Sequence, residues 1–168
     1  MKRVIPITER NKGFSELSPA GKRVAVARDV IAQLDEGAIK AQRGLYFSRR
    51  GRAFFDEDDN FVSEDAPRCS ACAVGSMMVS VFGTDCLKHE EDVSDVFWEC
   101  RNQLEEVFGS DQLALIENHF EGRRIRRDPW DDGKFTPAIR GLADKVLRAI
   151  MQNIIDHRGT FRPEKMKS

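Results

Sequence analysis

The fold is decided by the stretch Ala71-Cys-Ala-Val-Gly-Ser-Met-Met-Val-Ser-Val-Phe82, which is apolar on every side apart from Ser76 and Ser80. A helix that is apolar all round is a buried helix. We therefore predict a central helix over residues 71–82, with Gly83 closing it. Its two serines are expected to bond back to carbonyl groups of their own helix.

Four further helices are predicted around this one, because apolar residues recur at helical spacing. The first begins at Ser18-Pro19, which supply an N-cap and a first turn, and it ends at Gly37. The second covers residues 93–108, and the third begins at a Ser110 cap and ends at Gly122. The last and longest begins at Thr136-Pro137 and ends at Gly159. The residues expected to face inward are Val24, Ala27, Val30, Ile31 and Leu34; Val93, Val96, Phe97, Cys100, Leu104, Val107 and Phe108; Leu113, Ile116 and Phe120; and Ile139, Leu142, Val146, Ile150 and Ile154.

Residues 43–63 have a different character. Two short β-prone pieces, residues 45–47 and 53–55, flank Arg49-Arg50-Gly51, and a second turn at residues 58–60 precedes Phe61-Val62. This pattern predicts a small β-hairpin or meander. The expected fold class is thus mainly α, with about five helices packed around residues 71–82 and this β segment on one side. Residues 1–17 are expected to form a flexible arm, residues 18–159 a single helical domain, and residues 160–168 a C-terminal tail.

Composition is typical of one globular domain. The chain has 168 residues, of which 40% are hydrophobic and 33% charged, and such a length buries a sizeable core. The net charge of −1 is far from the basic excess of a protein that coats DNA. No secretion signal and no long apolar stretch is present, so we expect a cytoplasmic protein with reduced thiols and no membrane contact.

The pairs Cys69-x-x-Cys72 and Cys86-x-x-His89 together resemble a Cys₃His zinc site. Geometry argues against it, because a helix over residues 71–82 would hold the two pairs on the order of 17 Å apart. Ligands of one tetrahedral zinc lie within roughly 4 Å of each other. The alternative is that these are small core thiols.

An assembled catalytic set is missing from the sequence. The three histidines, His89, His119 and His157, lie in different segments, and neither a nucleophile elbow nor a phosphate-cradling glycine loop occurs. Cys72 could be activated at the start of its helix, but its apolar neighbours indicate an inert thiol. We therefore predict a protein that is not an enzyme and needs no cofactor.

Arginine is concentrated in two segments that lie outside the predicted helices. Residues 40–52 are basic without any acid and include Arg49, Arg50 and Arg52, and residues 56–65 then carry six acids. The second segment holds Arg123, Arg124, Arg126 and Arg127 and is followed by Trp130 and an Asp131-Asp132-Gly133 turn. Alternating charge blocks often serve only to keep a surface soluble. Arginine and tryptophan are also the residues that anchor interfaces, so these eight residues are the candidate partner-binding site.

The sequence Cys72-Ala-Val-Gly-Ser76, preceded by a helix and a short β segment, resembles a group of small phage and bacterial proteins of unassigned function. In that group a helix and a hairpin precede a buried Cys-Ala-Leu-Gly-Ala-type helix. Some members also carry a Trp/Tyr-Asn-Asp turn, to which Trp130-Asp131-Asp132 is similar. The resemblance covers residues 20–83 and 128–155, and it implies a phage or mobile-element setting without implying a reaction.

The leading functional hypothesis is a non-enzymatic binding protein, a phage or mobile-element accessory protein that engages a host protein through its arginine-rich loops. The alternative is a protein that binds nucleic acid through the same loops, which would make its affinity fall steeply with salt. A third hypothesis is a zinc protein that uses Cys69, Cys72, Cys86 and His89. A homodimer is compatible with all three.

Overall fold

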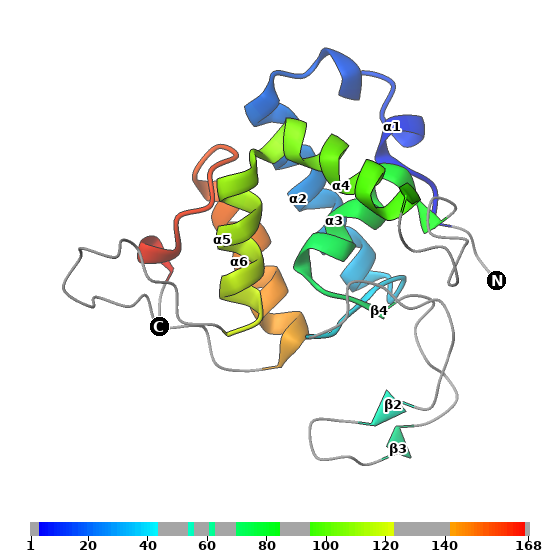
Figure 1. Ribbon diagram of the computed structural model, residues 1–168, viewed down its shortest axis with the longest axis vertical. Helices are drawn as coiled ribbons and strands as arrows, with labels where there is room; N and C mark the ends of the chain where they lie inside the picture. Colours follow the sequence, from blue (N-terminus) through cyan, green and yellow to red (C-terminus); the bar gives the residue numbers. More distant parts are fainter. Residues whose placement is uncertain are drawn as a thin grey trace.

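The computed structural model describes residues 4–43, 54–55, 61–62, 70–84, 95–122 and 142–166. In these ranges the chain is mainly helical, as the sequence predicts (Figure 1). None of the described helices is long and apolar enough to cross a membrane. The α-helices of the described ranges are α1 (Ile7–Arg10), α2 (Pro19–Asp35), α3 (Ala73–Phe82), α4 (Asp95–Phe108), α5 (Ser110–Phe120) and α6 (Ala143–Asp156).

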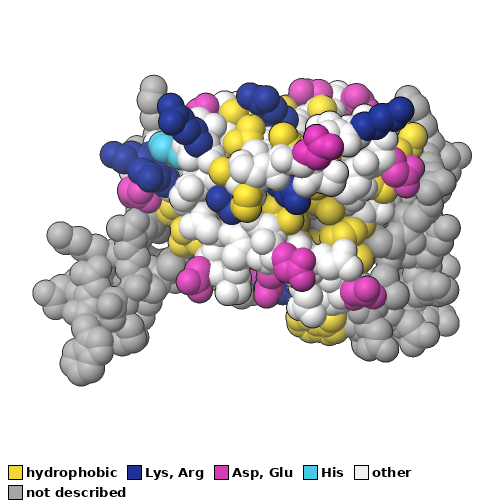
Figure 2. All heavy atoms as spheres, turned by 90° about the horizontal axis from the view of Figure 1, so that it is seen from above, with side chains coloured by type: hydrophobic (Ala, Val, Ile, Leu, Met, Phe, Trp, Pro, Cys, Tyr) yellow, Lys and Arg dark blue, Asp and Glu magenta, His cyan; other side chains and the backbone are white. Residues whose placement is uncertain are grey.

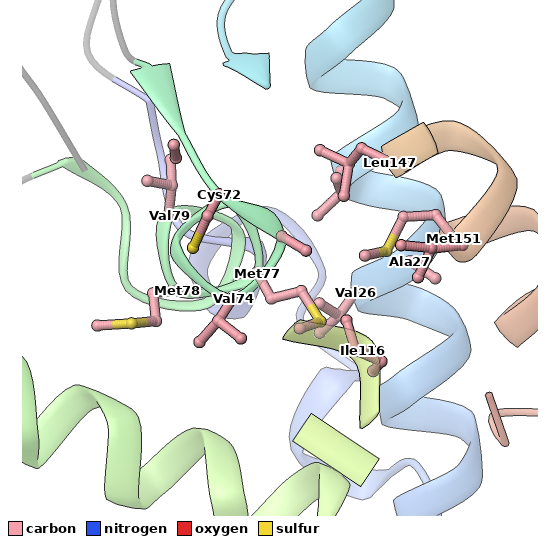
Figure 3. Close-up of a cluster of buried hydrophobic side chains, with 14 of the residues drawn as sticks. Val26, Ala27, Cys72, Val74, Met77, Met78, Val79, Ile116, Leu147 and Met151 are labelled. Carbon is pink, nitrogen blue, oxygen red and sulfur yellow. The ribbon is translucent and has the colours of Figure 1, made fainter. Parts of the chain in front are cut away.

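Helix α3 is the centre of the fold. Its residues from Ala73 to Val81 are buried, and it packs against α1, α2, α4 and α5. Met77 points from α3 toward Val26 of α2 and Ile116 of α5 (Figure 3). The predicted start at residue 71 is two residues early, because Ala71 belongs to a strand and Cys72 is the N-cap. Gly83 closes the helix with a positive φ of 72°, as predicted.

Helix α2 begins and ends close to the predicted residues. The Ser18 hydroxyl accepts a hydrogen bond from the Gly21 backbone N–H at 3.1 Å, and Pro19 occupies the first turn. The backbone N–H groups of the first turn have no carbonyl acceptor within the helix, and the Ser18 hydroxyl supplies one. The buried face includes Ala27, Val30 and Leu34, as predicted, whereas Val24 and Ile31 are only half-buried.

The helices after α3 follow their predicted apolar stripes with two corrections. Cys100, Leu104 and Phe108 of α4 are buried, as are Leu113, Ile116 and Phe120 of α5 and Val146, Ile150 and Ile154 of α6. The N-cap of α5 is Gly109 and not Ser110, which is the first residue of the helix.

Leu142 is the second correction. It has an extended backbone at the N-cap of α6 and a side chain that is 62% exposed, so it is not part of the inward stripe. Helix α6 therefore begins at Ala143 and has 14 residues, whereas α2 has 17 and is the longer of the two. The predicted opening at residues 136–137 and the stripe residue Ile139 lie outside the described ranges, as do the side chains of residues 93–97.

Parts of the expected arm and tail, residues 4–17 and 160–166, pack against the core. Val4, Ile7 and Phe14 are buried beside the helices, and residues 4–17 contain α1 and the 3₁₀ turn η1 (Phe14–Glu16). At the other end, Phe161 is 2% exposed and the 3₁₀ turn η3 (Pro163–Lys165) follows. The domain thus extends beyond residues 18–159 on both sides.

Two pairs of very short strands complete the described chain. β2 (Phe54–Phe55) and β3 (Phe61–Val62) are antiparallel, with Phe55 opposite Phe61, which fits the second predicted turn. The first predicted turn, at residues 49–51, lies outside the described ranges. β1 (Lys40–Ala41) and β4 (Ser70–Ala71) form a parallel pair that the sequence does not predict.

Candidate functional site

One end of the helical domain holds both ends of each arginine-bearing segment. We call this region the loop end and define it as residues 40–43, 70–71, 120–122 and 142–144. Segment 44–69 follows Arg43 and ends at β4, and within it the structure describes β2 and β3. Segment 123–141 follows the end of α5 and ends at Leu142. In Figure 1 the end of α5 and the start of α6 lie at the lower edge of the helices, near β4.

Strand β1 and the two residues after it contact the other described chain ends of the loop end. It pairs with β4, and the Gln42 backbone N–H donates to the Ala71 carbonyl at 2.9 Å, which joins the two ends of segment 44–69. The Arg43 Nε–H donates to the Phe120 carbonyl at 2.9 Å, so the chain just after β1 contacts the last turn of α5. The Ala41 N–H donates to the Asp144 carboxylate at 2.7 Å, and Asp144 lies in the first turn of α6.

The charges of the loop end suit these contacts. The Arg43 guanidinium meets the carbonyl end of α5, where a positive charge is favoured, and the Asp144 carboxylate lies at the amino end of α6, where a negative charge is favoured. Charged hydrogen bonds of this kind are shorter and stronger than neutral ones. These contacts therefore fix the described ends of the two segments to each other and to the packed helices.

The side chains that the sequence singles out for partner binding lie outside the described residues. They are Arg49, Arg50, Arg52, Arg123, Arg124, Arg126, Arg127 and Trp130. What the structure adds is Leu142, whose exposed side chain stands where segment 123–141 rejoins the core. The tryptophan within the described ranges is Trp98 of α4, which is 56% exposed and which sequence reasoning did not single out.

Of the four residues that a zinc site would use, the structure describes Cys72. Cys72 is the N-cap of α3, and its Sγ accepts a hydrogen bond from the Gly75 N–H at 3.4 Å. Burial raises the pKa of the Cys72 thiol to about 11, against the lowering effect of its backbone hydrogen bonds, and the charges of Glu117 and Glu121 raise it further. The thiol is thus protonated at neutral pH. Cys69, Cys86 and His89 lie outside the described ranges, within which no three His, Cys, Asp or Glu side chains gather around a common point.

His119 is a buried histidine that the sequence leaves unassigned. Its side chain is 1% exposed and meets the Phe161 ring edge-on, with the ring centroids 5.4 Å apart. Neither ring nitrogen has a hydrogen-bond partner among the described residues. Burial lowers the pKa of His119 below its ordinary value, because a charged imidazolium is poorly solvated there.

This burial predicts a pH dependence of stability. In the unfolded chain His119 titrates near its ordinary pKa of about 6.5, whereas in the folded chain it titrates lower. Between these two values the unfolded state binds more protons, so the free energy of unfolding should fall as the pH falls below about 6.5. Urea unfolding between neutral and mildly acidic pH should show this loss in the wild type and a smaller loss in His119→Phe. Identical pH profiles for the two proteins would show that His119 is not the cause.

Comparison of the chain with protein-family models, with curated proteins and with solved structures finds no match in any of the three. The class of protein is therefore given by the geometry: a mainly helical domain with two arginine-bearing segments based at one end.

Proposed function

We propose that the chain is a non-enzymatic binding protein whose loop end presents two arginine-bearing segments to one protein partner. The observation that carries this proposal is that the described ends of the two segments contact each other. Arg43 contacts Phe120, and Ala41 of β1 contacts Asp144. Segments far apart in the sequence thus start and finish at one place on a rigid core. Binding residues are commonly held in this way, on loops that a packed scaffold positions.

Two of the described side chains that a nucleophilic mechanism could use, Cys72 and His119, support the same proposal. Cys72 is 2% exposed with a raised thiol pKa, and His119 is 1% exposed. Both side chains serve packing and capping. Charge also favours a protein partner, because the net charge of −1 lacks the basic excess typical of nucleic-acid-binding proteins. On the face opposite the loop end, Lys and Arg likewise alternate with Asp and Glu among apolar groups (Figure 2). The resemblance of Cys72-Ala-Val-Gly-Ser76 to small phage proteins supports a host protein as the partner.

The test is capture of partners from the native host cell with the tagged chain, after nuclease treatment of the lysate. The matched variant reverses Arg123, Arg124, Arg126 and Arg127 to glutamate. We expect the wild type to retain a specific protein that this variant loses, because arginine side chains anchor interfaces. Retention of the same proteins by both would remove the proposal.

Nucleic acid is the second candidate, favoured by residues 40–52, which hold five basic side chains and no acid. Binding through phosphate contacts releases counterions, so the affinity for single- or double-stranded probes should fall steeply with salt concentration. A steep fall that the charge-reversed variant lacks would favour this function over a protein partner. No retardation of either probe would exclude it.

A further inference from the structure

A second polar site lies away from the loop end, where α1, α2 and α3 meet. Asp29 of α2 is at its centre, with a side chain that is 6% exposed. Its Oδ2 accepts hydrogen bonds from the Ser80 hydroxyl at 2.7 Å and from the Gln33 amide at 2.5 Å, and its Oδ1 contacts the Arg10 guanidinium at 2.5 Å. The sequence predicts that Ser80 bonds to its own helix. That is wrong for Ser80, although Ser76 does bond to the Cys72 carbonyl.

Asp29, which accepts, and Gln33 and Ser80, which donate to it, belong to the packed core. Asp29 and Gln33 are one turn apart on α2, where residues four apart face the same way, and Ser80 is on α3, which packs against α2. Because two neutral donors already share Oδ2, Oδ1 is left for a charged donor. Gln33 Oε1 is buried without a partner among the described residues, which leaves a further acceptor in the side chain of a residue that is 3% exposed.

The group that fills the site comes from outside that core. Arg10 is the last residue of the four-residue helix α1, and its side chain is 40% exposed. Its guanidinium bridges two acceptors, since Nε donates to the Ile5 carbonyl at 2.8 Å while Nη2 contacts Asp29. A planar group with several fixed donors can bridge in this way, whereas a lysine ammonium is a single point charge. The site therefore matches arginine in shape as well as in charge.

We propose that Asp29, Gln33 and Ser80 form a guanidinium-binding site and that Arg10 is its resident, displaceable ligand. Residues 4–17, whose Val4, Ile7 and Phe14 side chains pack in the core, are then held additionally by the ion pair between Arg10 and the buried carboxylate. Of the two acceptors, the Asp29 carboxylate lies on α2 and the Ile5 carbonyl lies just before α1. Both remain in a chain that lacks the Arg10 side chain, so they can accept a guanidinium group that is not attached to the chain. This inference concerns a different part of the fold from the loop end and does not depend on the proposed function.

The test is chemical rescue of the full-length Arg10→Ala variant. Removing the arginine leaves a buried carboxylate without its charged partner, which we expect to lower the unfolding midpoint by about 5 °C. Millimolar ethylguanidinium should raise the midpoint of this variant in a saturable manner and recover at least half of the loss. Ethylammonium at the same concentration is the matched probe, since it has the charge without the planar fork, and it should recover much less.

Two controls make the result decisive. The wild type and the double variant Arg10→Ala/Asp29→Asn should show no saturable rise, because in one the site is filled and in the other its charge is gone. Equal effects of ethylguanidinium on all three proteins, or no effect on Arg10→Ala, would overturn the proposal. Should Arg10→Ala fail to fold, the Arg10 Nε–H in the wild type gives a second measurement. We expect a slowly exchanging resonance with hindered rotation about the guanidinium bond, and free rotation would contradict the site.

Discussion

Replacing Gly159 with alanine is expected to lower the free energy of unfolding by about 3 kcal/mol, which in a domain of this size is roughly 6–12 °C in the unfolding midpoint. Gly159 follows the end of α6 with a φ of +89°, a conformation that is strained for any residue with a Cβ. An added Cβ would lie 2.6 Å from the Ala20 carbonyl oxygen of α2. Both the backbone of α2 and the turn would have to move.

The position of Gly159 makes such a movement costly. Its carbonyl accepts from the Arg23 Nε–H at 2.6 Å, and another Arg23 nitrogen donates to the Val107 carbonyl at 2.9 Å, so α2, α4 and the end of α6 meet there. Gly37 is the matched control, because it also has a positive φ, +63°, but an added Cβ would meet nothing within 4 Å. Gly37→Ala should cost about 1 kcal/mol. Equal losses for the two variants in urea unfolding would show that the contact with α2 is unimportant.

Met77→Ala is expected to cost about 2–5 kcal/mol, the range for truncating a large buried side chain. Met77 is fully buried at the centre of α3, and Figure 3 shows its side chain pointing toward Val26 and Ile116. Truncation would leave a cavity that three helices border and that the packed core cannot easily close. This variant is therefore the most direct test of α3 as the centre of the fold.

The control for Met77 is Met166→Ala, because Met166 is only partly buried near the C-terminus. Its truncation should cost about 1 kcal/mol or less, since water reaches the space that the side chain leaves. Chemical unfolding followed by circular dichroism gives both values under one set of conditions. A loss at Met77 no larger than that at Met166 would mean that α3 is not buried as described.

The helices were predictable because their burial leaves a period in the sequence. Leu113, Ile116 and Phe120 recur on one side of α5, and Ser18-Pro19 supplies the local chemistry of a helix start. The same rule fails at Leu142, which continues the apolar period although the backbone there is extended. Periodicity reports where apolar residues fall, but it does not report where the helical hydrogen bonds begin.

Contacts between distant segments were not predictable. β1 and β4 have two residues each, too few to show an alternation, and their pairing joins residues 41 and 71. Val4, Ile7 and Phe14 are buried but recur at no regular spacing, so the sequence of residues 1–17 looks like an arm. Asp29 lies between the buried Val26 and Val30, and only the fold shows that Arg10 and Ser80 reach it.

Part of the candidate site could likewise be predicted from the sequence and part could not. The arginine-rich segments are evident from the sequence as blocks of charge. Only the contacts of Arg43 and Asp144 show that the core holds the ends of these segments together. A carbonyl acceptor such as that of Phe120 has no signature in the sequence, because every residue has one.

The account is tested most directly by the affinity of the captured partner for two charge-reversed variants. One changes Arg49, Arg50 and Arg52 to glutamate, and the other changes Arg123, Arg124, Arg126 and Arg127. The control variant reverses Lys12 and Arg28, which are exposed and lie outside the loop end. If both segments contact one partner, calorimetry will show both loop variants weakened by about tenfold or more and the control within about twofold of the wild type. Weakening by only one loop variant, or by the control as much as by either, would contradict a single binding face at the loop end.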